Sequence, residues 1–148
     1  MNNMKKLFVI HGPNLNMLGI REPEIYGKAT YEDLLQYIKK EAADKGFETE
    51  FYQSNHEGDL IDYIQAAYGK ADCILINPGA YAHTSIALAD ALKILSSAGI
   101  PCAEVHLTDV TQREEYRRHS YTGEACCIFI AGKGFEGYGE AIAELAEI

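Results

Sequence analysis

The chain has 148 residues, of which 47% are hydrophobic and 24% charged, and its formal net charge is −9 at pH 7. This length is typical of a single domain, here spanning 1–148, which buries enough surface to fold without a disulfide or a structural metal. The excess of acidic groups argues against nucleic acid and against an anionic membrane surface as partners, although a local cluster of arginines still allows a small anionic ligand.

The chain carries no recognisable targeting or membrane segment. Its first apolar run, Leu7–Ile10, is far too short for a signal peptide, and no later run is long enough to cross a bilayer. The cysteines form no Cys-x-x-Cys pair and lie in apolar surroundings, which is typical of reduced core thiols. They are Cys73, Cys102, Cys126 and Cys127. We therefore expect a cytoplasmic protein.

The expected elements alternate between strands and helices. A continuous apolar run predicts the first strand at 6–10, and the long loop at 11–29 after it is of a kind that is usually functional. A helix is expected to begin with a capping box at Thr30 and Asp33 and to end near Gly46. The remaining strands are expected at 47–53, 73–76, 102–106 and 126–131, and the remaining helices at 60–67, 84–98, 113–118 and from about 138.

This alternation predicts an α/β fold with a parallel sheet and helices on both faces. Right-handed crossovers make the flavodoxin-like strand order 2-1-3-4-5 the simplest arrangement. Ligands bind such sheets outside the carboxyl ends of the strands, where the order reverses between strands 1 and 3. We therefore expect a site formed by the loops after strands 1, 3 and 4. Their polar residues are Asn14, Arg21, Tyr26, Asn77, His83 and His106.

All the arginines lie in two of these loops, which suggests one pocket for an anionic ligand. They are Arg21, Arg113, Arg117 and Arg118. Arginine is a rigid and permanently charged fork that matches carboxylates and phosphates. Arg113 and Arg117 are four residues apart and are predicted to share one helix face. The alternative is a solvated helix in which Glu114 and Glu115 pair with them.

Two side chains near the arginines are suited to proton transfer. Tyrosine is a base only as a phenolate, and bringing its ordinary pKa of about 10 near 7 needs about 4 kcal/mol of preferential stabilisation of the anion. Arg21, in the same loop as Tyr26, is placed to supply much of it. Glu104 and His106 share one strand face, so the carboxylate favours a protonated imidazole that acts as an acid. A surface tyrosine and a structural histidine are the alternatives.

Other patterns give weaker signals. His83 precedes a helix start that suits an anion, but Thr84 or Ser85 there is equally suited to a simple cap, and Asp90 on the same helix faces solvent by default. The motif Gly132–Gly137 matches G-x-G-x-x-G, yet the chain ends before the acidic residue that dinucleotide binding needs. A tight turn is the better interpretation. No metal site is expected, because the remaining histidines lack ligand spacing.

Several motifs follow one another in a fixed order. They are Gly12–Gly19, Arg21–Gly27, Gln53–Asn55, Ile76–Tyr81, His83–Ser85, Glu104–His106 and Arg113–Ser120. In these segments the chain closely resembles the type II 3-dehydroquinate dehydratases, and its length and element order agree with that family throughout. Independent motifs in the right order make the resemblance specific.

The resemblance implies a flavodoxin-like fold and the dehydration of 3-dehydroquinate to 3-dehydroshikimate and water through an enolate, without a cofactor. It also implies a homododecamer built as a tetramer of trimers. The same chemistry serves aromatic amino-acid biosynthesis in the shikimate pathway and quinate breakdown, and both stay open. The rival hypotheses are a carboxylate- or nucleotide-binding module on the same fold and a structural subunit with a vestigial site.

Roles for individual residues also follow from the resemblance. Tyr26 would match the base that takes a proton from C2, and Arg21 the residue that keeps it ionised. His106 would match the acid that protonates the departing hydroxyl, with Glu104 orienting it. Asn14 would match the residue that steadies the enolate through a water. The implied substrate ligands are Asn77, His83, Asp90 and Arg117 for the hydroxyls, and Leu107 with Thr108 for the carboxylate.

The chain departs from the family pattern at several positions. They are His11, Ala82, Ala89, Thr108, Asp109 and Thr111, which stand where Asn, Thr, Arg, Ser, Asn and His are usual. Asp109 is the departure with a clear consequence. It puts a carboxylate beside the expected carboxylate site, and like-charge repulsion weakens binding unless Asp109 faces away or pairs with an arginine.

Overall fold

A computed structural model describes residues 4–148, so 1–3, which we expected in the same domain, lie outside the described part. Five parallel strands form one sheet in the order β2-β1-β3-β4-β5. The predicted strand order is confirmed. The strands are β1 (Lys5–His11), β2 (Phe47–Gln53), β3 (Cys73–Asn77), β4 (Cys102–His106) and β5 (Ile128–Ala131).

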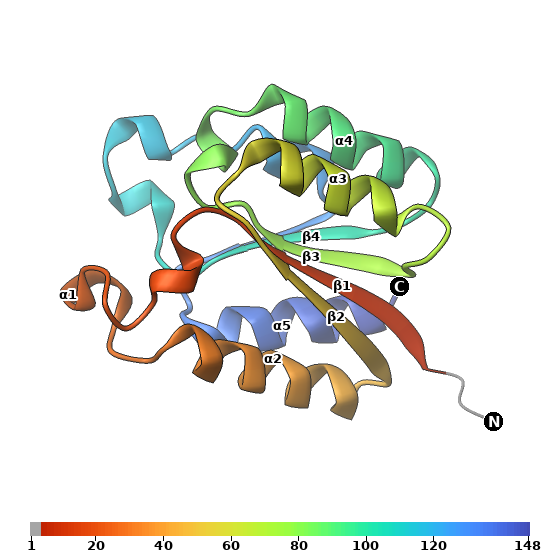
Figure 1. Ribbon diagram of the computed structural model, residues 1–148, viewed down its shortest axis with the longest axis horizontal. Helices are drawn as coiled ribbons and strands as arrows, with labels where there is room; N and C mark the ends of the chain where they lie inside the picture. The colour runs from red at the N-terminus through yellow and green to blue at the C-terminus, as the bar shows by residue number, and fades with distance from the viewer. Residues whose placement is uncertain (1–3) are drawn as a thin grey trace.

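Helices cover both faces of the sheet, as Figure 1 shows. On one face lie α2 (Tyr31–Asp44) and α5 (Phe135–Ala146), and on the other lie α3 (Glu57–Ala67) and α4 (Ile86–Ser97). The short α1 (Pro23–Tyr26) lies apart from these layers, in the loop after β1. The long loop at 11–29 therefore extends beyond the sheet edge where the strands end.

The central strand β1 explains why the core has two halves. Leu7 and Val9 pack in the apolar cluster under α2 and α5, whereas Phe8 and Ile10 pack in the cluster under α3 and α4. Side chains alternate between the two faces of a strand, so a strand covered on both faces must be apolar throughout. The continuous apolar run at 7–10 is the direct result.

The expected capping box at the start of α2 is present. The Thr30 hydroxyl accepts a hydrogen bond from the Asp33 amide at 3.1 Å, and the Asp33 carboxylate accepts one from the Thr30 amide at 2.9 Å. These two bonds lower the pKa of Asp33. The cap satisfies amides that have no partner inside the helix.

The predicted helix at 113–118 was wrong. Two short 3₁₀ turns, Val110–Gln112 and Glu115–Arg117, occupy this region, and Arg113 lies between them with an extended backbone (φ −95°, ψ −167°). The spacing of Arg113 and Arg117 matched a helix, but the segment has no apolar stripe that would hold a helix against the core. The two arginines therefore do not share one helix face.

Several element boundaries also moved, and the helix expected at 60–67 begins at Glu57. The helix expected at 84–98 begins at Ile86, because the Ser85 hydroxyl accepts from the Leu88 amide and caps it. The last strand begins at Ile128 instead of 126, and the last helix begins at Phe135 instead of 138. The two residues before β5 were expected to be buried within the strand.

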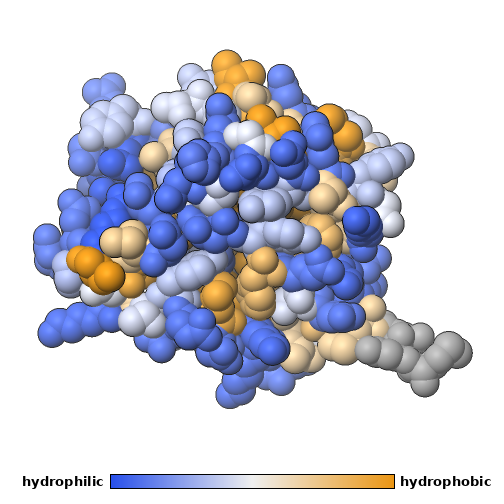
Figure 2. Space-filling view, viewed as in Figure 1, coloured by the Kyte–Doolittle hydropathy of each residue, from blue (hydrophilic) through white to orange (hydrophobic). Residues whose placement is uncertain are grey.

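The cysteine prediction was right for one pair and wrong for the other. Cys73 and Cys102 are buried free thiols, and burial raises the pKa of each to about 12. Cys126 is only half-buried and Cys127 is exposed, because both precede β5. No helix among residues 4–148 is long and apolar enough to cross a membrane. The face drawn in Figure 2 is mainly hydrophilic, with apolar side chains in small separate groups.

Candidate active site

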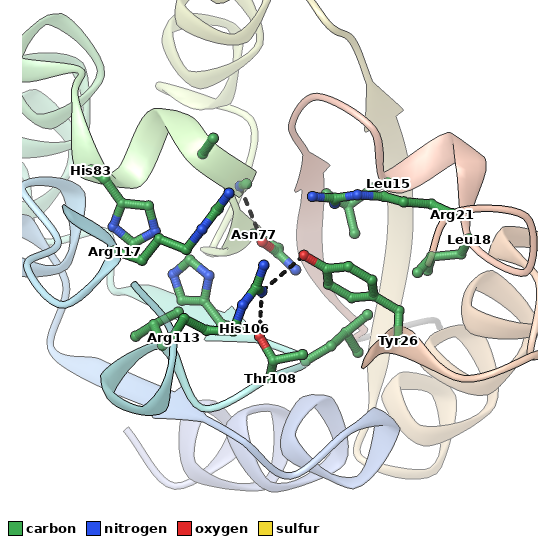
Figure 3. A pocket seen from close by; sticks show the side chains of 14 residues that line it. Leu15, Leu18, Arg21, Tyr26, Asn77, His83, His106, Thr108, Arg113 and Arg117 are labelled. Carbon is green, nitrogen blue, oxygen red and sulfur yellow. Dashed lines mark hydrogen bonds between the residues drawn. The ribbon is translucent and has the colours of Figure 1, made fainter. Parts of the chain in front are cut away.

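A cavity lies at the carboxyl ends of β1, β3 and β4, at the predicted switch point of the sheet (Figure 3). Eight of the ten predicted site residues line it. They are Arg21, Tyr26, Asn77, His83, His106, Leu107, Thr108 and Arg117. Loops far apart in the sequence thus meet at one place, as expected from the parallel sheet.

Two glycines let the loops after β1 and β3 approach closely. A Cβ at Gly12 would lie 2.3 Å from the Pro78 carbonyl oxygen, and the Gly12 amide donates to the Asn77 carbonyl at 2.8 Å. Gly79 has φ +61°, and a Cβ there would lie 3.0 Å from the Pro13 carbonyl oxygen. Only glycine fits both positions, so the Gly-Pro and Pro-Gly pairs of the two motifs hold these two loops against each other.

Tyr26 lies between two arginines. The guanidinium carbon of Arg21 lies 4.3 Å from the centre of the Tyr26 ring, in a cation–π contact. The hydroxyl oxygen instead accepts a hydrogen bond from Arg113 Nη1 at 2.9 Å, drawn in Figure 3. The arginine at the reactive oxygen is therefore Arg113, whereas the resemblance gave the role of holding the tyrosine to Arg21 alone.

The sequence placed Arg113 among the pocket arginines but gave it no catalytic or substrate-binding role of its own. Its Nη1 also donates to the Thr108 hydroxyl at 3.3 Å, so it joins Tyr26 to the expected carboxylate site. Burial opposes its charge, but the hydrogen bond to Tyr26 and the nearby carboxylates outweigh burial and raise the pKa of Arg113. The clustering of arginines placed it in the pocket, yet its contact with Tyr26 depends on the extended backbone between the two turns.

Glu104 holds His106 as predicted. Glu104 is fully buried, and its Oε2 lies 2.7 Å from His106 Nε2. The same carboxylate accepts from the Ser120 hydroxyl at 2.5 Å and from the Thr122 hydroxyl, so it has the donors that a buried carboxylate needs. Since a carboxylate only accepts, Nε2 carries a hydrogen, and Nδ1 is the nitrogen left for proton exchange.

His83 lies next to this pair. Its Nδ1 donates to the His119 carbonyl at 2.8 Å, and its ring stacks on His106 with the centres 6.0 Å apart. Burial lowers the pKa of His83. The hydrogen bond to the His119 carbonyl raises this pKa, but the charges of His106 and Arg117 lower it again, and the net shift is downward. A neutral His83 that donates through Nδ1 presents Nε2 as an acceptor.

Asn14 and Asp90 are the predicted residues that do not line the cavity. Asn14 is exposed at the start of a 3₁₀ turn with φ +71°. Its backbone N–H donates to Asn55 Oδ1 at 3.1 Å. Asp90 is exposed on α4. Asp90 therefore lies outside the cavity of its own chain.

Asp109 is turned away from the cavity. Its Oδ1 accepts from the Thr111 amide at 3.0 Å and from the Thr111 hydroxyl at 2.6 Å, which caps the turn Val110–Gln112. It does not line the cavity, so the like-charge repulsion considered above is avoided. Thr111, a departure to which the sequence gave no consequence, supplies both donors.

The glycine-rich motif after β5 supports the loop after β4. The Gly132 amide donates to the His106 carbonyl at 3.2 Å, and the Gly134 amide donates to the Leu107 carbonyl at 3.0 Å. Gly132 has φ +84°, and a Cβ there would lie 2.8 Å from Asp109 Cβ. The predicted tight turn is confirmed, and its task is to hold the loop that carries His106.

Glu114 pairs with the arginines at the rim. Arg117 Nε donates to its carboxylate at 2.7 Å, and Arg113 Nε lies 3.7 Å from the same oxygen. The interpretation of Glu114 as a local partner was thus right, although both arginines line the cavity as well. Among residues 4–148, no three His, Cys, Asp or Glu side chains are grouped to hold a metal ion.

A model of the family described as dehydroquinase class II matches residues 5–146. The chain belongs to this family. A 3-dehydroquinate dehydratase of Clostridium acetobutylicum is 55% identical over 140 residues, which are 95% of each chain. The catabolic 3-dehydroquinase 2 of Neosartorya fischeri is 49% identical over 139 residues, 94% of this chain and 91% of that one.

Solved structures agree with this assignment. The crystal structure of the type II dehydroquinase from Butyrivibrio crossotus superimposes with a TM-score of 0.91 at 50% identity, and the match covers 96% of this chain and 97% of that one. The α/β fold of the chain is therefore the fold of its family. Dehydration of 3-dehydroquinate, the family's reaction, is its activity.

Proposed function

We propose that the cavity binds 3-dehydroquinate and that Tyr26, as a phenolate, removes the proton from C2 next to the ketone. The hydrogen bond from Arg113 Nη1 to the Tyr26 hydroxyl oxygen at 2.9 Å carries this proposal. A guanidinium at that oxygen stabilises the negative charge on it, and Arg21 against the ring adds a second positive charge. The two arginines share the role that the resemblance gave to Arg21.

His106 acts at the other end of the reaction. Loss of the C2 proton gives an enolate, whose electrons expel the hydroxyl at C1 and restore the ketone as a conjugated enone. His106 gives its proton to the departing hydroxyl, which leaves as water. The buried Glu104 carboxylate at 2.7 Å orients the ring. Asn14, outside the cavity lining, steadies the enolate through a water.

The remaining lining residues bind the substrate. Asn77, His83 and Arg117 contact its hydroxyl groups, and the loop of Leu107 and Thr108 receives its carboxylate. Arg113 lies 3.3 Å from the Thr108 hydroxyl and so adds positive charge to that end. A carboxylate bound there meets no opposing charge from Asp109, which faces the Thr111 turn.

The same proposal includes assembly as a homododecamer, a tetramer of trimers. Asp90 is exposed on α4 and does not line the cavity of its own chain. As a substrate ligand, Asp90 must therefore serve the cavity of a neighbouring copy. The enzyme acts in the cytoplasm, consistent with its free cysteines, and the chain 1–148 works as one catalytic domain.

Replacing Tyr26 by Phe tests the catalytic assignment. The variant keeps the ring and its contact with Arg21 but has no hydroxyl, so we expect turnover to fall below detection while the Kd of 3-dehydroquinate stays within a few-fold of the native value. Turnover is followed by the ultraviolet absorbance of the enone product, and binding by calorimetry. A fully active Tyr26→Phe enzyme would exclude the phenolate base. Native protein that binds dehydroquinate without forming the chromophore would support the binding-module alternative.

A further inference from the structure

A buried chain of hydrogen bonds lies behind Asn77, outside the cavity. Asn77 Nδ2 lies 3.0 Å from the Tyr138 hydroxyl, and that hydroxyl lies 3.1 Å from His11 Nε2. The other ring nitrogen, His11 Nδ1, lies 3.0 Å from the Tyr31 hydroxyl. His11 and Tyr138 are fully buried, and only Asn77 lines the cavity. The chain connects β1, α2 and α5 to the site.

The direction of each hydrogen bond follows from one backbone amide. The Gly79 N–H donates to Asn77 Oδ1 at 3.1 Å, and a backbone N–H can only donate. The Asn77 atom that faces Tyr138 is therefore the amide nitrogen, which can only donate as well. The Tyr138 oxygen accepts this bond. Its own hydrogen then has one remaining partner among residues 4–148, His11 Nε2.

The tautomer of His11 is fixed in the same way. Nε2 accepts from Tyr138, so a neutral ring carries its hydrogen on Nδ1, which donates to the Tyr31 hydroxyl. Burial lowers the pKa of His11 to about 3, which keeps the ring neutral near neutral pH. With the opposite tautomer, the Tyr138 hydroxyl would accept twice and its hydrogen would be buried without an acceptor.

We propose that Tyr138 and His11 are positioning residues that lock the Asn77 amide with its oxygen on Gly79 and one N–H left free for the substrate. The inference rests on the proposed function, in which Asn77 contacts a substrate hydroxyl. The lock specifies that contact: Asn77 donates, so the substrate offers a hydroxyl oxygen as acceptor. His11 stands where the family usually has Asn, and its longer side chain reaches both tyrosines at once.

Two matched variants separate positioning from general stability. Tyr138→Phe and Tyr31→Phe each remove one hydroxyl from His11, but only Tyr138 touches Asn77. We expect Tyr138→Phe to raise KM several-fold, up to roughly tenfold, with a smaller change in kcat. Tyr31→Phe should keep KM near the native value. Equal increases in KM for the two variants would overturn the proposal.

A double-mutant cycle with Asn77→Ala tests the coupling directly. If Tyr138 acts through Asn77, Tyr138→Phe should raise KM no further once Asn77 is Ala. An equal further increase would overturn the lock. Should Asn77→Ala raise KM while Tyr138→Phe leaves it unchanged, the lock fails and the proposed substrate contact stands. Should Asn77→Ala itself leave KM unchanged, the contact and the lock both fail.

The native enzyme supplies a readout that needs no variant to fold. In ¹⁵N NMR spectra of histidine-labelled protein, His11 should show a neutral ring with hydrogen on Nδ1 and none on Nε2, unchanged between pH 5 and 9. A His11 resonance with hydrogen on Nε2, or one that titrates in this range, would overturn the proposed direction of the hydrogen bonds.

Discussion

The cation that contacts the Tyr26 oxygen is 87 residues away in the sequence. Arg21 lies in the same loop as Tyr26 and was therefore the natural candidate for this contact, yet it packs on the ring face. The hydroxyl oxygen carries the charge of a phenolate, so Arg113 is better placed to stabilise it. A contact between residues so far apart depends on the backbone path of two loops.

Arg113→Ala should therefore lower kcat more than it raises KM. Loss of one donor to a charged oxygen in an active site lowers turnover roughly 100-fold. The matched control is Arg118→Ala, because Arg118 is exposed and does not line the cavity. Steady-state kinetics measure kcat and KM of both variants for comparison with the native enzyme. A similar loss in the two variants, or a kcat of Arg113→Ala within a few-fold of native, would contradict the role of Arg113.

His11 makes stability depend on pH. Its pKa falls from 6.5 in the unfolded chain to about 3 in the fold, so the unfolded chain binds the extra proton first as the pH drops. The stabilisation is complete above pH 6.5 and is lost progressively from there towards pH 3. Between pH 7 and 5 the loss integrates to about 2 kcal/mol, since the slope approaches 1.36 kcal/mol per pH unit below pH 6.5.

His11→Asn removes this titration and keeps a side chain that the family usually carries. Urea unfolding of both proteins at pH 7 and pH 5 measures the difference. We expect the native protein to lose about 2 kcal/mol more than the variant between these two values. Parallel losses in the two proteins would show that His11 is not the group responsible.

At the scale of elements, the sheet and its order followed from the sequence because the strands are short runs, apolar or alternating, and helical stripes separate them as far as β4. The path of the loop that carries Arg113 did not follow from the sequence. Its charge spacing fits a helix, but capping of the turn by Asp109 and Thr111 and the absence of an apolar face decide its path. The eight predicted residues that line the cavity belong to motifs at or after the strand ends, whereas the contact of Arg113 with Tyr26 depends on tertiary geometry.

Gly132→Ala tests the support that the turn after β5 gives to the His106 loop. The new Cβ meets Asp109 Cβ at 2.8 Å at φ +84°, so the loop must shift, and we expect a higher KM together with lower stability. Gly99→Ala is the control, because Gly99 has φ +83° and nothing within 4 Å of a Cβ. It should lose about 1 kcal/mol of unfolding free energy from backbone strain and keep the native KM. Kinetics and thermal unfolding of the pair distinguish support of the site from strain alone.

For the whole molecule, charge is divided between the surface and the site. The chain is strongly acidic, with a net charge of −9, but three of its four arginines line one cavity. An anionic substrate therefore meets a local positive potential in a molecule that otherwise repels it. The acidic Asp90 on the exposed side of α4 is outside this cavity, and under the proposed function it serves the cavity of a neighbouring copy.

Subunit mixing tests whether Asp90 acts in a neighbouring chain. Tyr26→Phe and Asp90→Asn proteins should each be poorly active as pure assemblies. If Asp90 crosses to a neighbour, chains unfolded together and refolded at equal amounts regain cavities with a native Tyr26 from one chain and a native Asp90 from the next. Random mixing restores roughly a quarter of the cavities. Folded assemblies combined without unfolding are the control, and light scattering should give twelve chains of 16.4 kDa in each sample. Activity that stays at the level of the pure variants would place Asp90 in its own chain or outside the reaction.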